Sequence, residues 1–200
     1  MGEILFLTNS DNTKELFDWI CSKVTATYCS EPLDLELLKT YNPKFVVSYN
    51  YKYIVPAECI KYMNGRIVNM HISYLPFNRG ASPNIWSFIE DTPKGVTIHE
   101  MTDGLDKGKI IFQKELHFDN EKETLATTYD KLNIEMTNLF KEHFNELYLG
   151  NYEAKNQVGK GSYHSVKDLN DFATKIDFKW SDKINDFLIR VKEAKKQGII

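Results

Sequence analysis

The stretch FVVSYNYKYIVPAECIKYMNGRIVNMH, residues 45–71, contains the unit that decides the fold. Phe45–Tyr49 is a short apolar run typical of a buried strand, and Arg66–His71 is a second run of the same kind. Between them Pro56 opens a helix, and Asn64-Gly65 ends it. A strand, a helix and a strand in succession predict a right-handed parallel βαβ unit.

The residues before this unit show the same alternation of predicted strands and helices. Glu3–Thr8 predicts a buried strand, Asn12 with Glu15 predicts a helix cap, and Val24–Tyr28 predicts a second strand. A short helix around residues 33–38 follows and ends before Asn42-Pro43. We therefore expect the α/β class: a Rossmann-like, mostly parallel twisted sheet with helices on both faces.

Different elements follow the βαβ region. Val96–Met101 and Lys109–Phe118 predict a hairpin-like pair, and Glu121–Leu149 has the apolar stripe of a long amphipathic helix that ends at Gly150. We expect residues 1–150 to form a catalytic domain. Residues 151–200, with a final helix from about Ser181, are then a C-terminal extension packed on the same domain.

Composition excludes several functional classes. The 200 residues carry a formal net charge of −3, so nothing in the composition suggests a surface for nucleic acid or an anionic membrane. The apolar run Ile4–Leu7 is too short for a signal peptide or a membrane span. Three cysteines without a C-x-x-C pair favour neither a disulfide framework nor a metal site. We expect a cytoplasmic protein without a bound metal.

Asn69 and His71 stand at the carboxyl end of a predicted strand, where ligands bind in such sheets. Strand alternation points both side chains to one face. An amide and an imidazole together can stabilise a carbonyl oxygen that gains charge while a proton moves. Asp106, near Gly104 and Gly108, is the best candidate for the carboxylate that would orient the imidazole. A lone His at a strand end is nevertheless more often structural, and spacing does not show that Asp106 meets His71.

Two motifs resemble a known family. The run NMHISYLPFNRGASP, residues 69–83, followed by GVTIHEMTDGLDKGKIIFQ, residues 95–113, closely resembles the formyltransferases that use N10-formyltetrahydrofolate. The family pattern is Asn-x-His, Leu-Pro, Arg-Gly and Pro, then Gly-Val-Thr-x-His and Asp-x-Gly. Every element is present in order, although family members often have Asp-Thr-Gly where this chain has Asp106-Lys107-Gly108.

The resemblance implies a role for particular residues. Asn69, His71 and Asp106 would be catalytic, with the substrate amine attacking the formyl carbon and Asn69 and protonated His71 stabilising the tetrahedral oxyanion. N10-formyltetrahydrofolate would be the co-substrate, held by Tyr51, Lys52, Tyr53, Ile54, Thr102, Asp103, Gly104 and Leu105. The amine substrate would be bound by Ser73, Tyr74, Asn78, Arg79 and Gly80.

Three subfamilies differ in the amine that they formylate. Methionyl-tRNA formyltransferases add a C-terminal barrel and a basic surface, which this acidic chain with fifty residues after Gly150 does not match. Phosphoribosylglycinamide formyltransferases have a Gly-Ser-Asn phosphate loop after the first strand, whereas this loop is Thr8–Asn12 with an aspartate. Sugar N-formyltransferases are most similar, so the expected substrate is a nucleotide-linked aminosugar. Trp86 would suit stacking on its base, although such an aromatic is more often core.

Alternatives from other classes stay open. A non-catalytic folate-binding homologue would keep the pocket without the chemistry, and a hydrolase would use water in place of the amine. The many apolar positions of 121–149 are compatible with a homodimer as well as with packing on the protein's own sheet.

Overall fold

The computed structural model describes residues 2–200. Two compact units interleave along the chain. Unit 1 comprises Met1–His71, Ile98–Phe112 and Leu139–Gln157, and unit 2 comprises Ile72–Thr97, Gln113–Asn138 and Val158–Ile200. The predicted division into residues 1–150 and 151–200 stays a prediction.

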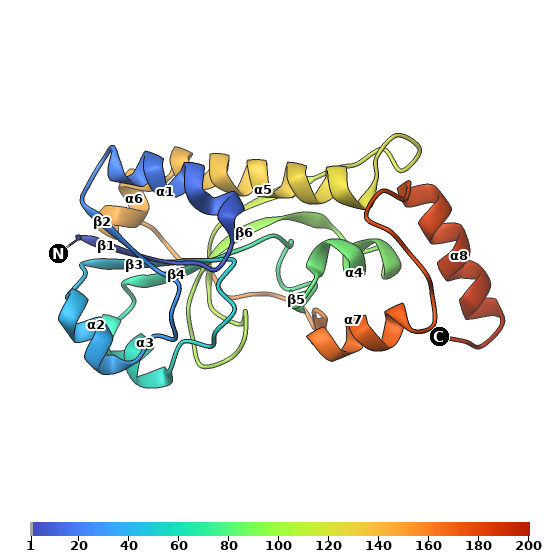
Figure 1. The fold of residues 1–200 in the computed structure, drawn as a ribbon. Coiled ribbons are helices and arrows are strands. Elements are labelled where there is room, and N and C mark those ends of the chain that lie inside the picture. Colours follow the sequence, from blue (N-terminus) through green and yellow to red (C-terminus); the bar gives the residue numbers. More distant parts are fainter. Residues whose placement is uncertain (1) are drawn as a thin grey trace. The chain divides into compact units, whose positions relative to one another are not determined.

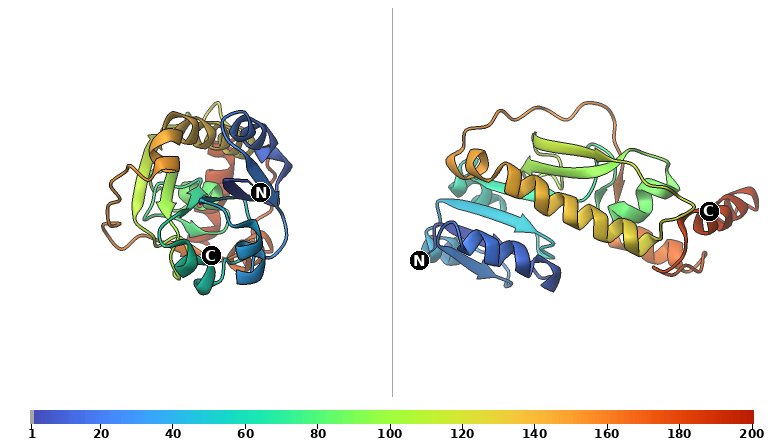
Figure 2. Two further views of the ribbon diagram at one scale, coloured as in Figure 1. Left: turned by 90° about the vertical axis from the view of Figure 1, so that its left-hand side faces the viewer. Right: turned by 90° about the horizontal axis from the view of Figure 1, so that it is seen from above.

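Six strands form one sheet in the order β2-β1-β3-β4-β6-β7. Their bounds are β1 (Ile4–Leu7), β2 (Ala26–Cys29), β3 (Phe45–Tyr49), β4 (Ile67–His71), β6 (Lys94–Glu100) and β7 (Ile110–Leu116). β1 pairs in parallel with β2 and β3, and β3 pairs in parallel with β4. β6 and β7 form an antiparallel hairpin, and the two strands lie side by side in Figure 2. The predicted mostly parallel α/β sheet is confirmed.

Helices cover both faces of the parallel strands in unit 1. α1 (Lys14–Cys21) and α6 (Phe144–Leu149) lie over one face, and α2 (Leu35–Tyr41) and α3 (Ala57–Met63) over the other (Figure 1). Every residue of β1 and β3 is therefore buried, as expected for strands covered twice. A cluster of buried side chains from β1, β3, β4, α2 and α3 forms the core under the second pair of helices.

Local capping explains where α2 begins and where both α2 and α3 end. The Asp34 carboxylate accepts a hydrogen bond of 2.7 Å from the backbone N–H of Leu37 at the start of α2. Asn42 ends α2 and Asn64 ends α3, both in the left-handed conformation that asparagine tolerates. These ends fall where the Asn-Pro and Asn-Gly pairs predicted them.

Two local predictions were wrong. Asn12 does not cap the first helix, because a 3-10 turn, η1 (Asp11–Thr13), precedes α1 and the Asn12 amide oxygen accepts hydrogen bonds from Ser10 and Asn50. The predicted helix 121–149 is divided into α5 (Leu125–Glu142) and α6. His143 lies at the division, where its imidazole stacks on the ring of Phe112 at 3.7 Å.

Unit 2 holds elements that periodicity did not reveal. They are β5 (Arg79–Gly80), α4 (Pro83–Ile89), β8 (Tyr163–His164) and α7 (Val166–Ala173), and they accompany the expected final helix α8 (Ile184–Lys196). Ser165 and Asp168 form a capping box at the start of α7. Buried side chains of α4, α5, α7 and α8 form a second core. Across residues 2–200, no helix has the length and apolarity needed to cross a membrane.

Candidate active site

The strand β4 ends in Asn69 and His71, at the carboxyl edge of the sheet in unit 1. Asn69 is half-buried and His71 is 8% exposed. Both side chains approach the carboxylate of Asp106, so they share a face as the alternation predicted. The buried residue Met70, which lies between them, points away by the same alternation.

Asp106 lies at the centre of the cluster. Its Oδ1 accepts a hydrogen bond of 3.1 Å from Asn69 Nδ2, and its Oδ2 lies 3.7 Å from His71 Nε2. The latter distance is that of an ion pair rather than of a hydrogen bond. Asp106 is only 7% exposed, so its charge is weakly screened by solvent and acts strongly on its neighbours. The structure therefore brings together the three residues that spacing alone could not.

A fourth residue, His99 of β6, completes the cluster. Its Nε2 lies 3.3 Å from Asn69 Nδ2 and 3.4 Å from Asp106 Oδ1, and its side chain is almost fully buried. Its Nδ1 lies 2.8 Å from the carbonyl oxygen of Glu100. A carbonyl oxygen only accepts, so Nδ1 carries the proton, and in a neutral His99 the Nε2 lone pair accepts from Asn69.

This tautomer determines whether the nitrogen or the oxygen of the Asn69 amide faces His99 and Asp106. Both neighbours of its nitrogen, the Asp106 carboxylate and neutral His99 Nε2, are acceptors. Turning the amide over would place its oxygen against two acceptors, which is unfavourable. His99 and Asp106 together therefore orient the donor group of Asn69. When His99 is protonated, its Nε2–H points to the Asp106 carboxylate and the nitrogen no longer accepts from Asn69. One Asn69 amide hydrogen is then available to a ligand oxygen.

The loop that carries Asp106 is held in an uncommon conformation. Asp106 has a φ of 51°, in the left-handed region. Gln157 stabilises the loop by donating hydrogen bonds of 2.7 Å to the carbonyl of Asp106 and 2.8 Å to that of Gly108. A Cβ on Gly108 would lie 1.6 Å from the carbonyl oxygen of Glu100, so only glycine allows this approach.

The residues predicted to hold the pterin lie in two loops of unit 1. In the first, Tyr51 accepts from the backbone N–H of Leu33 at 2.9 Å and donates to the Glu31 carbonyl at 2.5 Å. Burial raises the pKa of Tyr51 to about 12, so its hydroxyl keeps its proton in this role. Tyr53 packs edge-on against Tyr51, and the Lys52 ammonium lies 4.8 Å from the centre of the Tyr53 ring.

Both loops also expose an apolar side chain. Ile54 is 85% exposed and Leu105, next to Asp106, is 49% exposed. Thr102 and Asp103 are exposed and Gly104 is half-buried, with Thr102 donating to the Gly104 carbonyl. Accessible apolar surface beside a polar cluster suits a ligand with a flat ring and polar edges, which is what a reduced pterin offers. The pterin-binding roles of all eight residues stay predictions.

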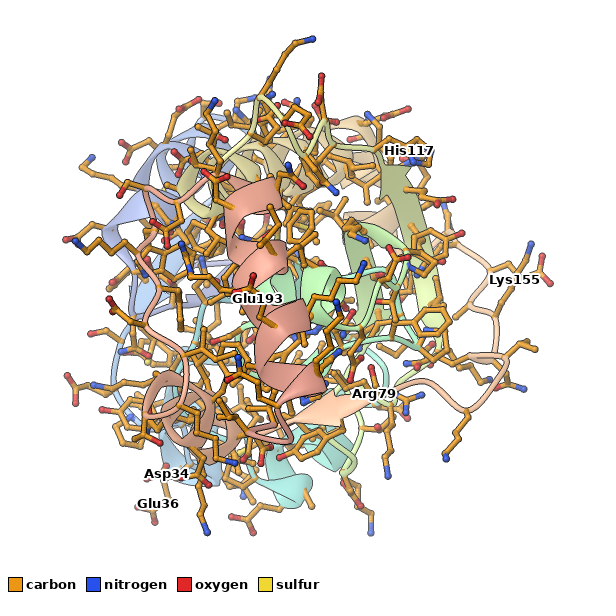
Figure 3. All side chains as sticks on the ribbon, turned by 90° about the vertical axis from the view of Figure 1, so that its right-hand side faces the viewer. Asp34, Glu36, Arg79, His117, Lys155 and Glu193 are labelled. Atoms are coloured by element: carbon orange, nitrogen blue, oxygen red, sulfur yellow. The ribbon has the colours of Figure 1, made fainter. Side chains whose placement is uncertain are left out.

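The residues predicted to bind the amine substrate lie in unit 2. Ser73 and Asn78 are buried, whereas Tyr74, Arg79 and Gly80 are half-buried. Asn78 bonds to Glu90, Ser162 and Thr92, which makes it an anchor of its loop. Arg79 lies on β5 beside Tyr163 of β8, and Figure 3 labels it next to that strand. Substrate binding by these five residues stays a prediction.

Trp86 belongs to the core rather than to an open stacking platform. It is 8% exposed, and one face of its ring is covered by His164 at 3.9 Å. Its ring also meets Phe172 edge-on. The suggested stacking of a nucleotide base on Trp86 is therefore not available on the face that His164 covers.

The structure adds Gln157 and places His99, which the sequence analysis had only as the histidine of the Gly-Val-Thr-x-His motif, in the polar cluster. One signal could have found His99: along β6 the apolar residues Val96 and Ile98 alternate with Thr97 and His99, which places a buried imidazole on a polar stripe. No comparable signal marks Gln157, which lies 51 residues from its partner Asp106 and in no regular element.

A family model described as formyl transferase matches residues 21–143 of this chain. The chain belongs to the formyl transferase family. A dTDP-4-amino-4,6-dideoxyglucose formyltransferase of Mycobacterium bovis is 32% identical over 157 residues, which are 78% of this chain and 64% of the relative. The chain thus spans just under two thirds of the length of that relative. A methionyl-tRNA formyltransferase of Thermodesulfovibrio yellowstonii is also 32% identical, over 64% of this chain and 42% of the relative.

Among solved structures, the formyltransferase PseJ of Anoxybacillus kamchatkensis is similar over most of its length. It shares 37% identity with a TM-score of 0.86, covering 94% of this chain and 98% of PseJ. That crystal structure contains UDP-4,6-dideoxy-4-formamido-L-AltNAc and tetrahydrofolate. A sugar N-formyltransferase of Shewanella has a TM-score of 0.76 at 24% identity, which shows the shared fold. The predicted family and fold are confirmed.

Proposed function

We propose that this protein transfers a formyl group from N10-formyltetrahydrofolate to the primary amine of a nucleotide-linked aminosugar. The observation that carries the proposal is the buried cluster of Asn69, His99 and Asp106 beside His71, at the carboxyl edge of a formyl transferase fold. The similarity to PseJ over nearly its whole length supports the sugar substrate.

Each polar group then has a task. Protonation of His99 leaves one amide hydrogen of Asn69 available, and Asn69 donates it to the carbonyl oxygen of the group being transferred, which gains negative charge as the amine adds. His71, within ion-pair distance of Asp106, supplies a second donor for that oxygen when it is protonated. The sugar amine loses a proton and the departing folate nitrogen gains one, so Asp106 and His71 serve as the relay between them. No net proton is consumed.

The first loop of the sheet favours a sugar substrate over phosphoribosylglycinamide. Both polar groups of the Asn9 side chain are used, since Nδ2 donates to the Ser30 carbonyl at 2.6 Å and Oδ1 accepts from the Lys52 backbone at 3.0 Å. The Asn12 amide oxygen accepts from Ser10 and Asn50. A loop whose polar side chains bond to the protein, with Asp11 in its turn, is a poor cradle for phosphate.

The names of two relatives reduce the range of candidate sugar substrates. The Mycobacterium enzyme is named for a 4-amino-4,6-dideoxy sugar, and PseJ was crystallised with a 4-formamido-4,6-dideoxy sugar. We therefore propose a 4-amino-4,6-dideoxyhexose linked to a nucleoside diphosphate as the substrate class. The homodimer stays a prediction.

The decisive experiment supplies formyl-folate with a panel of dTDP- and UDP-linked 3-amino and 4-amino sugars. Formation of tetrahydrofolate is followed by absorbance, and a gain of one formyl group on the sugar by mass spectrometry. We expect both signals with 4-amino sugars. Tetrahydrofolate released without any amine would identify a hydrolase instead, and folate binding without turnover would identify a non-catalytic homologue.

A further inference from the structure

Unit 2 contains a polar cluster that the transfer chemistry does not use. It ties β5, the strand with Arg79 and Gly80, to β8 in the C-terminal segment. The two strands pair in parallel, with backbone hydrogen bonds of 3.1 Å from Arg79 N–H to the Ser162 carbonyl and 2.8 Å from Ala81 N–H to the His164 carbonyl. We call residues 78–81 and 162–164 the β5–β8 ribbon.

This ribbon needs external support. Asn78 and Gly80 both have positive φ, 56° and 86°, in the left-handed region that asparagine and glycine tolerate. A Cβ on Gly80 would lie 2.2 Å from the His164 carbonyl oxygen, so the two strands touch closely. Two-residue strands contribute few hydrogen bonds. Side chains must therefore hold the ribbon in shape.

Glu90, just after α4, supplies that support from a single carboxylate. Its Oε2 accepts from Asn78 Nδ2 at 3.0 Å and from Ser162 Oγ at 2.8 Å, and its Oε1 lies 2.8 Å from His164 Nε2. A carboxylate only accepts, so His164 Nε2 carries a proton that it donates. Glu90 thus bonds at once to a residue of the Asn78–Ala81 turn and to two residues of the C-terminal segment.

The partners of Glu90 are themselves fixed. His164 stacks on the Trp86 ring with an angle of 7° between the planes. The Asn78 side chain is fully buried, and its amide oxygen accepts from Thr92 at 2.8 Å. Hydrogen bonds to an ionised group are stronger than neutral ones, and several converging on one carboxylate make a rigid cluster.

We propose that Glu90 is a positioning residue for the nucleotide-sugar: it holds Arg79 and Gly80 in a binding conformation by linking Asn78 to Ser162 and His164. This inference rests on the proposed function, because Arg79 and Gly80 are substrate-binding residues only in that function. It gives Ser162 and His164 of the C-terminal segment a part in substrate recognition. Glu90 contacts no reacting atom and acts through the ribbon.

Kinetics of Glu90→Gln test the proposal. A glutamine has the same size, but three donors face it, and it can accept on one side only. We expect the KM for the aminosugar nucleotide to rise about tenfold, the factor that corresponds to ~1.4 kcal/mol. We expect kcat to stay within about threefold and the KM for formyl-folate to be unchanged, since an interaction used in binding alone affects KM.

Two further variants make the result specific. Asp91→Asn is the matched control, because Asp91 is the neighbouring carboxylate, its side chain is fully exposed, and asparagine tolerates its φ of 51°. It should behave as wild type. His164→Phe keeps an aromatic ring against Trp86 but has no donor for Glu90. It should raise the same KM, and the double variant should be no worse than the poorer single variant.

Hydrogen exchange separates this inference from the proposed function. Without substrate, Glu90→Gln should speed exchange of the backbone amides of Asn78, Arg79 and Ala81, and Asp91→Asn should not. Wild-type protein inactive on every aminosugar nucleotide would overturn the proposed function, and the exchange data would still decide whether Glu90 holds the ribbon. Unchanged exchange together with unchanged KM would overturn the inference. Global unfolding of both Glu90→Gln and His164→Phe would also overturn it, because Glu90 would then be purely structural.

Discussion

The imidazole of His99 orients the carboxamide of Asn69, with His99 Nε2 at 3.3 Å from Asn69 Nδ2. The Glu100 carbonyl holds the proton on His99 Nδ1, so in a neutral His99 the facing nitrogen accepts. The Asn69 amide is thereby held with its nitrogen, rather than its oxygen, toward Asp106. This is the orientation that Asn69 needs in order to donate to the carbonyl oxygen of a formyl group. The orientation of Asn69, on β4, thus depends on His99, the last residue but one of the neighbouring strand β6.

Replacing His99 by leucine should lower kcat while leaving the fold intact. Leucine fills the space but accepts no hydrogen bond, so the Asn69 amide loses one of the two acceptors that orient it. We expect a loss of roughly 10- to 100-fold in kcat, as for one hydrogen bond in a buried charged cluster. Steady-state kinetics measure it, with the exposed His117→Leu as control (His117 is labelled in Figure 3). Wild-type kcat in His99→Leu would remove His99 from the site.

Asp106→Asn separates the charge of this residue from its backbone conformation. Asparagine tolerates the φ of 51° at least as well as aspartate, so the loop should keep its shape. The amide cannot stabilise a protonated His71 or take part in a proton relay. We expect kcat to fall roughly 10²- to 10⁴-fold, with folate binding retained by equilibrium titration. Retention of more than a tenth of the activity would contradict the assignment.

Gly108→Ala should displace the Asp106 loop. The added Cβ would lie 1.6 Å from the Glu100 backbone carbonyl, which cannot move without disturbing His99 on the same strand. We expect a loss of stability of ~1–3 kcal/mol in denaturant unfolding and a loss of most activity. Gly104→Ala is the matched control for stability, because the nearest atoms to its Cβ would belong to the flexible Lys107 side chain. An equal loss of stability in the two variants would show that the close approach at Gly108 is unimportant.

Stability should depend on pH through Glu123. A hydrogen bond from Lys131, and then one from Thr127, holds the pKa of Glu123 below its ordinary value of 4.5. A carboxyl group whose pKa is lowered by folding stabilises the folded state above its unfolded pKa, and that contribution disappears as the pH falls through the folded pKa. Glu123→Gln should therefore lower the melting temperature by a few degrees at pH 7 and have less effect below about pH 4.

Thermal unfolding across pH 3–7 measures this difference. Glu121→Gln serves as the control, because Glu121 is exposed and its side chain forms no ion pair with Lys131. A constant difference between Glu123→Gln and wild type at every pH would show that the carboxylate charge does not contribute.

Several features followed from local sequence. The alternation along Ile67–His71 placed Asn69 and His71 on one face, and the Asn42-Pro43 and Asn64-Gly65 pairs marked where α2 and α3 end. These predictions succeeded because strand periodicity and left-handed caps depend on residues a few positions apart. The glycine neighbours of Asp106 already made it the best candidate carboxylate, and the family motifs implied its catalytic role, but neither gave its distance from His71.

Tertiary structure alone decided the rest. Asn69 and Asp106 are 37 residues apart, and Glu90 and His164 are 74 apart, yet each pair is in hydrogen-bond contact. The division of the predicted helix at His143 likewise accompanies a stacking contact with Phe112 of β7. Hydrophobic periodicity specifies which face of an element is buried, whereas the pairing of polar side chains across the chain depends on how the elements pack and on which donors and acceptors then meet.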